Sequence, residues 1–475
     1  MPTDAMRTRQ LLLVLGLSLA SLTMTAQTAT YFMDGVATRH TQNPAFDSER
    51  NYISIPGVGQ SGIGLNGNTR IDNFIMPRTV DGTLKTVTFL HPTVALSDLD
   101  FPERNKLTAS LNAQLLGVGF HARGGFTTVS VNLRKEAGLN LPGEMFTMMK
   151  ELKNRDYNVG DGDIYARAWG EVGIGHSRQV NKHLRLGAKV KFLWGMTSGK
   201  ASFKDLRLNL ESPEQWTVSG QAQVDVSHKG FAWGAPQTKT YKTTGESYEC
   251  VDFNNVEWGK RRVSLSGGGV AFDLGMEYKL KGLLNGLELS AAVTDLGFIG
   301  WDNTKRAGNM GQPFTFDGFH NIRVKGHEGD VPFKNQGEEL LDDMAQFYTV
   351  QADKSKMTVT PLGATLNVGV AYAMPFYKRL KVGLLSTSRL MKPCRWNEER
   401  LSVNLQPVDF LEMSVSASAG TLGKSWGAVV NVKPKGFNLF VGMDHYIGKL
   451  GKPCVPLGNS ADVYVGMNVT FGKKR

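Results

Sequence analysis

The residues that could do chemistry are scattered along this chain and form no catalytic motif. The nine histidines are isolated, with no HExxH pair and no His/Cys set at metal-ligand spacing. The stretch Ser418 to Ser425, SAGTLGKS, approaches a phosphate-binding loop, but Ser418 stands where the first glycine belongs. We therefore predict no catalytic residue, no cofactor and no metal site.

Cysteine and charge content narrow the function further. The three cysteines, Cys250, Cys394 and Cys454, are odd in number and far apart, so at most one disulfide can form, with Cys394 and Cys454 as the pair to consider. The chain carries 54 Lys and Arg against 43 Asp and Glu, a formal net charge of +11. These basic residues stand singly, so we expect no nucleic-acid partner and instead attraction to anionic membrane lipid.

Charged residues do recur at alternate positions within apolar segments. Such residues could form the selectivity filter of a pore, or they could pair across strands and fill the interior of a structural barrel. The candidates for this inward-facing set are Arg167, Glu171, Arg185, Lys189, Lys191, Asp273, Glu277 and Glu288.

The elements that position these residues are β-strands. From Leu184 to Trp194 every second residue is apolar, while the residues between are mostly small or charged. The preceding segment, Ile164 to Arg178, alternates in the same way, and only the polar link Gln179 to His183 joins the two. The pattern predicts an antiparallel hairpin with one apolar and one polar face.

Similar runs of about ten residues recur to the end of the chain, joined alternately by short turns and long loops. A soluble β-sandwich also alternates, but this length and repetition are typical of a transmembrane β-barrel. Because an open sheet would leave backbone groups unpaired in hydrocarbon, the barrel must close. We predict an all-β antiparallel barrel of about 14 strands, within a range of 12 to 16, in contact with outer-membrane lipid.

The first 26 residues resemble a secretory signal peptide. Arg7 and Arg9 precede the apolar run Leu11 to Leu22, and small residues lead to Ala26. We expect cleavage between Ala26 and Gln27, and export to the outer membrane of a Gram-negative bacterium.

The segment 27–48 contains Asn43, Pro44, Ala45 and Phe46, and an extended SIPG follows at 54–57. Pro44 fixes φ and keeps Asn43 out of the α region, so this element begins a turn. With Arg39 and His40 before it, the pattern resembles the amino-terminal segment of outer-membrane barrels of Bacteroidota. It is similar to an uncharacterised barrel family of unknown function, distantly related to FadL fatty-acid transporters and PorV secretion-associated barrels.

The resemblance implies that residues 27–48 form a plug inside a barrel that spans 49–475. An ordinary turn before the first strand is the alternative. It also implies a non-enzymatic function, the uptake or capture of a small and, by analogy with FadL, hydrophobic molecule. The polar lumen suits a polar solute or a structural barrel equally well. A partner-docking barrel for secretion or envelope assembly, and a barrel enzyme acting on lipid, are the alternatives.

Four segments lack steady alternation, and we expect long loops there: 67–105, 135–162, 228–265 and 301–359. The first is either a loop or an inserted subdomain. In the second, Met145, Met148, Met149 and Leu152 share one helical face, which predicts a short amphipathic helix. The last two are the candidate surfaces for protein partners. A further hairpin, residues 202–227, either projects beyond the membrane or joins the wall.

Overall fold

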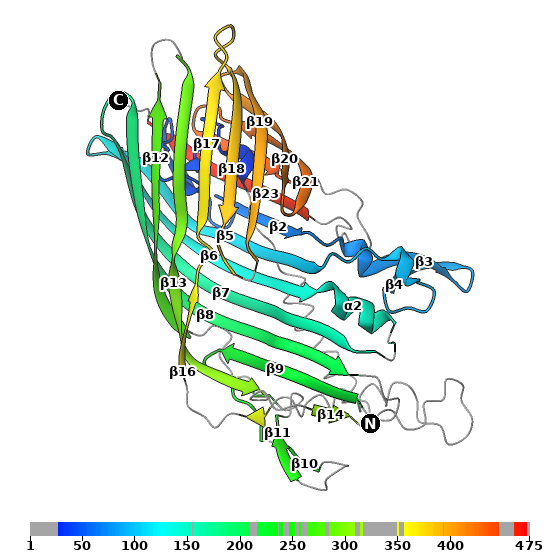
Figure 1. The fold of residues 1–475 in the computed structure, drawn as a ribbon. Helices are drawn as coiled ribbons and strands as arrows, with labels where there is room; N and C mark the ends of the chain where they lie inside the picture. The colour runs from blue at the N-terminus through cyan, green and yellow to red at the C-terminus, as the bar shows by residue number, and fades with distance from the viewer. Residues whose placement is uncertain are drawn as a thin grey trace.

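A computed structural model describes residues 27–472, apart from 152, 154, 210–215, 236, 241–246, 252–255, 258–264, 281–284, 309–313, 317–348, 351–355, 393 and 446–459. The predicted signal peptide lies outside these described residues. Within them the chain forms an all-β antiparallel barrel with one short α-helix (Figure 1).

Fourteen strands close the barrel within the described residues, as predicted. The first strand consists of two pieces, β1 (Asn51–Ser54) and β2 (Ser61–Gly67), which both pair with β5 and with β23. The wall then continues through β5 (Arg104–Ala122), β6 (Gly125–Pro142), β7 (Tyr157–Gln179), β8 (Leu184–Asn209), β12 (Gly267–Lys279), β13 (Leu287–Gly308), β17 (Thr365–Ala373), β18 (Leu380–Arg389), β19 (Trp396–Val408), β20 (Leu411–Gly420), β21 (Gly423–Val432), β22 (Phe437–Met443) and β23 (Ser460–Phe471).

Residues 55–60 interrupt the first strand without opening the wall. Gly57 adopts a φ of 79°, a conformation that glycine reaches without steric cost. Its backbone N–H donates to the carbonyl of Gln114 on β5, and Met467 on β23 exchanges backbone hydrogen bonds with Ile55 and Val58. The break therefore keeps its backbone groups paired with both neighbouring strands.

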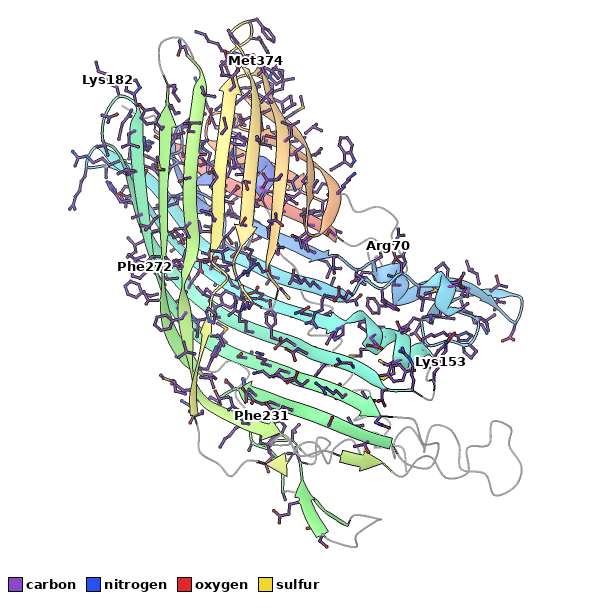
Figure 2. The ribbon with its side chains drawn as sticks, viewed as in Figure 1. Arg70, Lys153, Lys182, Phe231, Phe272 and Met374 are labelled. Atoms are coloured by element: carbon purple, nitrogen blue, oxygen red, sulfur yellow. The ribbon has the colours of Figure 1, made fainter. Side chains whose placement is uncertain are left out.

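The alternation of side chains separates an outer apolar face from a polar interior. On β7 and β8, Ile174 and Leu186 are 51% and 45% exposed, whereas Arg185 and Lys189 are buried. Phe272 on β12 lies on the same outer face, and Figure 2 shows its ring outside the wall. A closed barrel with an apolar exterior is the architecture of bacterial outer-membrane proteins, and we place this chain in that membrane.

The two ends of the barrel differ. Short turns at 123–124, 180–183 and 433–436 gather at one end, where β1 begins and β23 ends, and we call this the turn end. The long connections gather at the opposite, or loop, end. In Figure 2 the turn-end residues Lys182 and Met374 lie at the top, and the loop-end residues Arg70 and Lys153 lie at the right.

At the loop end several strands run further than predicted. β6 continues to Pro142, β7 begins at Tyr157 and β13 continues to Gly308, so the loops predicted at 135–162 and 301–359 begin or end within strands. The loop-end part of β8, from Ser198, pairs not with β12 but with β9 (Trp216–Ser227), which also pairs with β13. The additional hairpin therefore extends beyond the wall, and the barrel has 14 strands instead of 16. Outside the membrane both faces of a strand meet water, so the apolar alternation that marks a strand disappears.

The segment 67–105 forms a small subdomain at the loop end. It contains the 3₁₀ turns η3 (Ile71–Asn73) and η4 (Leu96–Asp98), and β3 (Ile75–Val80) pairs with β4 (Thr83–Thr88) in a separate hairpin. Its core consists of aromatic side chains with ring centroids 4.9 to 6.1 Å apart, namely Phe74, Phe89, Phe101 and Phe146.

The predicted amphipathic helix is α2 (Gly143–Lys150), and it packs against this subdomain. Phe146 is its main buried residue, and Met145 packs on the same cluster, whereas Met149 is exposed. Leu152 lies outside the described residues. No helix in the described part of the chain is long and apolar enough to cross a membrane.

The orientation of the strands can be tested with a charge on the outer face. Replacement of Ile174 by Arg should destabilise the barrel by about 2–4 kcal/mol, because the guanidinium would enter the hydrocarbon region. The same change at Leu84, exposed in the β4 hairpin outside the wall, should cost less than about 0.5 kcal/mol. Urea titrations of folding into lipid vesicles measure both. Equal costs would contradict a lipid-facing Ile174.

Candidate functional site

Residues 27–48 lie inside the barrel as a plug, and they appear as the dark blue segment within the upper part of the wall in Figure 1. The segment contains two single-turn 3₁₀ elements, η1 (Thr28–Thr30) and η2 (Arg39–Thr41), and most of its side chains are buried. Its backbone has no sheet partner, so its polar groups are paired through local turns within the segment and with side chains of the wall.

The carboxylate of Asp444 anchors the start of the plug. It accepts hydrogen bonds from the backbone N–H groups of Thr28 and Ala29, at 2.6 and 2.9 Å, and from the Thr28 hydroxyl at 2.7 Å. The hydroxyl of Tyr464 on β23 donates to the same carboxylate at 2.9 Å. One wall residue thus holds the N-terminal turn of the plug.

An ion-pair network holds the middle of the plug. Asp34 pairs with Arg39 of the plug and with Lys381 on β18, each at 2.7 Å, and Lys381 also pairs with Glu288 on β13 at 2.8 Å. Burial opposes ionisation of Asp34, but the charges of Lys381 and Arg39 outweigh it and lower its pKa. The backbone N–H of Gly35 donates to Glu412 on β20 at 3.0 Å.

The Asn43–Phe46 element forms a turn inside the lumen, closed by the Phe46 N–H donating to the Asn43 carbonyl at 2.9 Å. The Asn43 amide donates to the carbonyl of Met276 on β12 at 3.1 Å. Two wall glycines make room for the turn: a Cβ on Gly187 would lie 2.0 Å from the Pro44 carbonyl oxygen, and one on Gly275 would lie 2.0 Å from the Asn43 side chain. The element is therefore a turn that packs against the inner face of the wall.

Aromatic side chains of the plug also pack on wall glycines. Tyr31 makes edge contacts with Phe32 and Phe46 at 5.0 Å between centroids. A Cβ on Gly383 would lie 2.3 Å from the Phe32 ring, and the Cβ of a residue at Gly369 would be 3.0 Å from it. This apolar contact forms the tightly packed part of a largely polar lumen.

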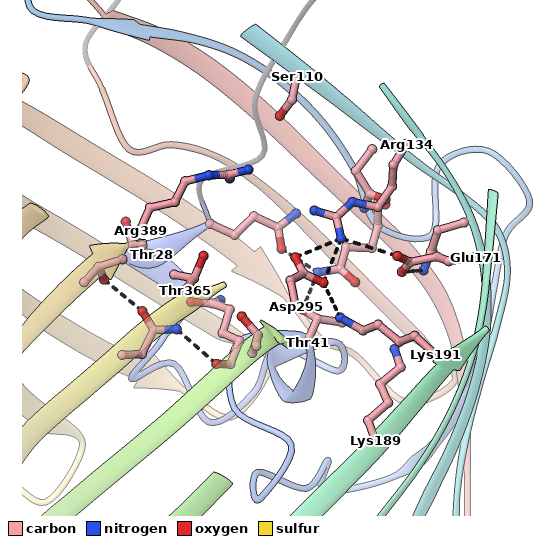
Figure 3. A pocket seen from close by; sticks show the side chains of 18 of the residues that line it. Thr28, Thr41, Ser110, Arg134, Glu171, Lys189, Lys191, Asp295, Thr365 and Arg389 are labelled. Atoms are coloured by element: carbon pink, nitrogen blue, oxygen red, sulfur yellow. Dashed lines mark hydrogen bonds and ion pairs between the residues drawn. The ribbon is translucent and has the colours of Figure 1, made fainter. Parts of the chain in front are cut away.

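A cavity of about 160 Å³ lies on the loop-end face of the plug. Plug residues such as Gln27 and Thr41 form its floor, and hydroxyl, amide and charged side chains of the wall form its sides (Figure 3). A second cavity of about 570 Å³ lies at the turn end, where Gly35 and Ala37 of the plug meet Lys433 and Phe437. The plug therefore contributes to the lining of a cavity on each of its two sides.

Seven of the eight charged residues predicted to face inward are buried, and the eighth, Glu288, is half-buried and pairs with the inward-facing Lys381. Arg185 pairs with Asp47 of the plug, at 2.9 Å, and Lys191 pairs with Asp273 and with Asp295, at 2.8 and 2.6 Å. The remaining contacts are Arg167 with Glu136, Glu171 with Arg134, Glu277 and Glu288 with Lys279, and Lys189 with the Ser130 hydroxyl.

Several partners of these residues were not predicted. Arg134 and Glu136 continue the inward face of β6, but the predicted strand ends at Leu133, one residue before Arg134. Asp295 lies in a β-bulge: its φ is 58°, and the inward positions of β13 change from even to odd numbers there. Extending the alternating pattern of β6 beyond Leu133 would have identified Arg134 and Glu136. The bulge at Asp295 could not be identified in this way, because an alternating pattern does not indicate where a bulge lies.

Two groups that resemble parts of a hydrolase site lack the geometry of one. Both ring nitrogens of His445 face carboxylates, Asp462 and Glu398, so neither is available to activate a hydroxyl. The sequence does contain one nucleophile-elbow pattern, GKSWG at 423–427, but Ser425 lies within β21 and not at a strand-to-helix turn. Within the described residues no group of His, Cys, Asp and Glu side chains is arranged to hold a metal ion.

The structure bears on the possible disulfide and on the segment that resembles a phosphate-binding loop. Cys394 is buried and its thiol donates to the Leu139 carbonyl, whereas Cys454 lies outside the described residues. The phosphate-loop-like segment Ser418 to Ser425 forms the tight hairpin between β20 and β21. Such a hairpin lacks the helix N-terminus on which a phosphate-binding loop depends.

His40 is the titratable plug residue with the clearest response to acid. Its ring shares a hydrogen bond with the Tyr52 hydroxyl. Burial, with a smaller contribution from the Lys189 ammonium, lowers the pKa of His40 to about 3. The neutral imidazole is therefore the form that fits the docked plug.

Plug docking should weaken in acid. In the undocked plug, His40 should have an ordinary pKa of ~6.5. Between about pH 6.5 and pH 3, His40 is therefore protonated in the undocked form and neutral in the docked form, so lowering the pH favours undocking. Acidification from pH 7.5 to 5 should disfavour docking by about 2 kcal/mol. Hydrogen exchange of amides 36–46, corrected for intrinsic rates, measures this change. H40Q should lose the dependence, and an equal dependence in H40Q would contradict the role of His40.

The glycine contact with the plug gives a second test. Gly187→Ala places a methyl group against the Pro44 backbone and should favour undocking by about 1–3 kcal/mol. Gly199→Ala, on the same strand, has no atom within 4 Å of its new Cβ and serves as the control. Trypsin cleavage after Arg39, followed by mass spectrometry, should accelerate only in the first variant. Similar rates in both would show that the plug does not rest on Gly187.

Comparison with known proteins gives a family and several distant structural likenesses. None of the curated proteins compared with the chain matches it. The toluene transporter TodX of P. putida has 11% sequence identity and a TM-score of 0.37, over 92% of this chain and 95% of TodX. A FadL homologue of Pseudomonas aeruginosa has 11% identity and a TM-score of 0.34, over 94% and 97% of the two chains. Residues 44–444 match the model of a family of unknown function, and the protein therefore belongs to this family, DUF5723.

Proposed function

We propose that this protein is a gated, non-enzymatic outer-membrane barrel that captures a small polar solute from the loop end and admits it past the plug. The observation that carries the proposal is the pair of lumen cavities that the plug separates. A structural barrel needs a filled interior, but it does not need a polar cavity on each side of a separate segment.

The lining of the loop-end cavity favours a polar solute over a hydrophobic one. Its walls carry the charged side chains Arg134, Lys191 and Asp295 together with amides and hydroxyls. An apolar molecule there would bury these groups without offering them hydrogen bonds, at a cost of about 1–3 kcal/mol for each group. We do not transfer the toluene substrate of TodX to this chain, because the proposal rests on the lumen of this chain alone.

Passage requires movement of the plug. The hydrogen bonds and ion pairs that hold it involve polar groups of the wall, and water in the lumen can replace each of them. The wall strands, in contrast, pair with one another along the whole membrane-spanning region. Movement of residues 27–48 therefore leaves the barrel intact.

Docking of a partner protein is a second candidate function. β8 and β13 extend beyond the wall and pair with β9, and the 67–105 subdomain projects beside them, so the loop end offers surfaces away from the membrane (Figure 1). The segments proposed as partner surfaces, 228–265 and 301–359, are only partly described. Flux through the barrel separates the two candidates, because docking requires none.

A reversible lock on the plug tests the gate. The Phe32 Cγ would lie 2.8 Å from a Cβ on Gly383, so cysteines at positions 32 and 383 are within reach of a disulfide. These two cysteines are introduced into a variant in which the three native cysteines are replaced by alanine. Proteoliposomes are then assayed with radiolabelled sugars, sugar acids and amino acids. We expect the reduced protein to pass at least one solute roughly tenfold faster than the oxidised protein.

Each single-cysteine variant provides a control, because its flux should not respond to oxidation. Reduction of the locked protein should restore the flux. If no solute passes in the reduced state, or if oxidation leaves the flux unchanged, the gated-uptake function is wrong and the docking function is favoured.

A further inference from the structure

We infer that the loop-end cavity, of about 160 Å³, is a binding site for a small hydroxylated carboxylic acid, whose carboxylate pairs with Lys189. The inference rests on the proposed function and adds the chemical class of the solute. It depends on three features of the structure: the charge balance around the cavity, the position of the Lys189 ammonium and the polar groups of the remaining lining.

The charged side chains in and beside the cavity do not balance. One positive charge is in excess, because five cations face four carboxylates. The carboxylates are those of Glu136, Glu171, Asp273 and Asp295. Four of the five cations have ion pairs: Arg134 with Asp295 at 2.9 Å, Arg167 with Glu136 at 2.7 Å, Lys191 with Asp273 at 2.8 Å, and Arg389 with Glu136. The fifth is Lys189, and among the described residues no carboxylate oxygen lies within 4.0 Å of its ammonium.

The Lys189 ammonium is buried but not fully bonded. The residue is 3% exposed, and its side chain extends across Gly173 to donate to the Ser130 hydroxyl at 2.9 Å. An ammonium group has three donors, so this contact leaves two of them available. Lys189 lines the cavity, and Figure 3 shows its side chain beside that of Lys191. Burial of an unpaired charge is costly, and an anion in the cavity would offset that cost.

The remaining lining identifies the rest of the ligand. Hydroxyl and amide side chains dominate it, and such groups both donate and accept hydrogen bonds, as the hydroxyls of a polyol or a sugar do. A cavity of roughly 150 Å³ accommodates benzene, so this one suits a compound built on a single six-atom ring. The residues concerned are Thr41, Gln60, Asn112, Asn132, Thr294 and Thr365.

D-Glucuronate and D-glucose form a matched pair of probes, because they differ in one carboxylate. Isothermal titration of the full chain in detergent micelles measures the affinity for each. We expect glucuronate to bind at least roughly tenfold more tightly than glucose, since a hydrogen bond to a charged group is worth about that factor. Equal affinities, or no binding of glucuronate, would overturn the inference. So would inorganic phosphate that binds where glucuronate does not.

K189M should reduce the affinity for glucuronate to that for glucose and leave glucose binding unchanged. K182M, in the turn between β7 and β8 and outside the cavity, is the control and should bind as the native protein does. Because methionine removes an unpaired buried charge, K189M without ligand should have a Tm at or above that of the native protein. A lower Tm would show that Lys189 has a counter-charge and would contradict the inference.

The binding measurement tests the inferred solute class, and the flux measurement tests the uptake function, so either one can be contradicted without the other. Binding of glucuronate through Lys189 without any flux would leave the site intact and remove the uptake function. Flux past a movable plug without preference for the carboxylate would support the uptake function and remove the inferred solute class.

Discussion

Closure of the sheet is the constraint on which the rest of this structure depends. Fourteen strands can lie in hydrocarbon only because β1 and β2 pair with β23 on one side and with β5 on the other, so that no strand edge meets lipid. Closure fixes which side chains face inward, and the lumen then has to accommodate every polar residue that the strands carry. The break at 55–60 respects the same constraint, because its backbone groups remain paired with both neighbours.

The plug follows from the size of the barrel. A wall of 14 strands encloses more space than its own side chains fill, and the segment 27–48 occupies part of the remainder. The fit depends on small wall residues at the contact points: Gly187 and Gly275 face the Asn43–Phe46 turn, and Gly383 faces Phe32. Where the wall carries long charged side chains instead, as at Lys189 and Lys191, the plug leaves a cavity. The distribution of glycine and lysine along β8 therefore decides where the lumen is filled and where it is open.

Much of the wall could be predicted from the sequence, because lipid on one side and a polar lumen on the other impose a period of two. The hairpin of β7 and β8 and the inward positions of Arg185 and Lys189 follow from that period. Three features could not be predicted in this way. The extension of β13 and β8 beyond the membrane lacks an apolar face, the bulge at Asp295 reverses the alternation, and the pairing of Arg134 with Asp295 joins strands that are distant in sequence.

The energetics of the plug contacts bear on the gate that we propose. Tyr31, Phe32 and Phe46 are almost fully buried, and exposing three such side chains to a water-filled lumen would cost about 5–9 kcal/mol. The polar contacts add less, because water replaces them at a net cost of about 1 kcal/mol each. In the proposed gate, complete undocking would therefore be rare without a ligand or partner. A solute that is bound on the loop-end face, next to Thr41 and Gln60, contacts the plug directly, so its binding energy can be used to shift the plug. Selectivity and gating would then reside in the same small group of side chains.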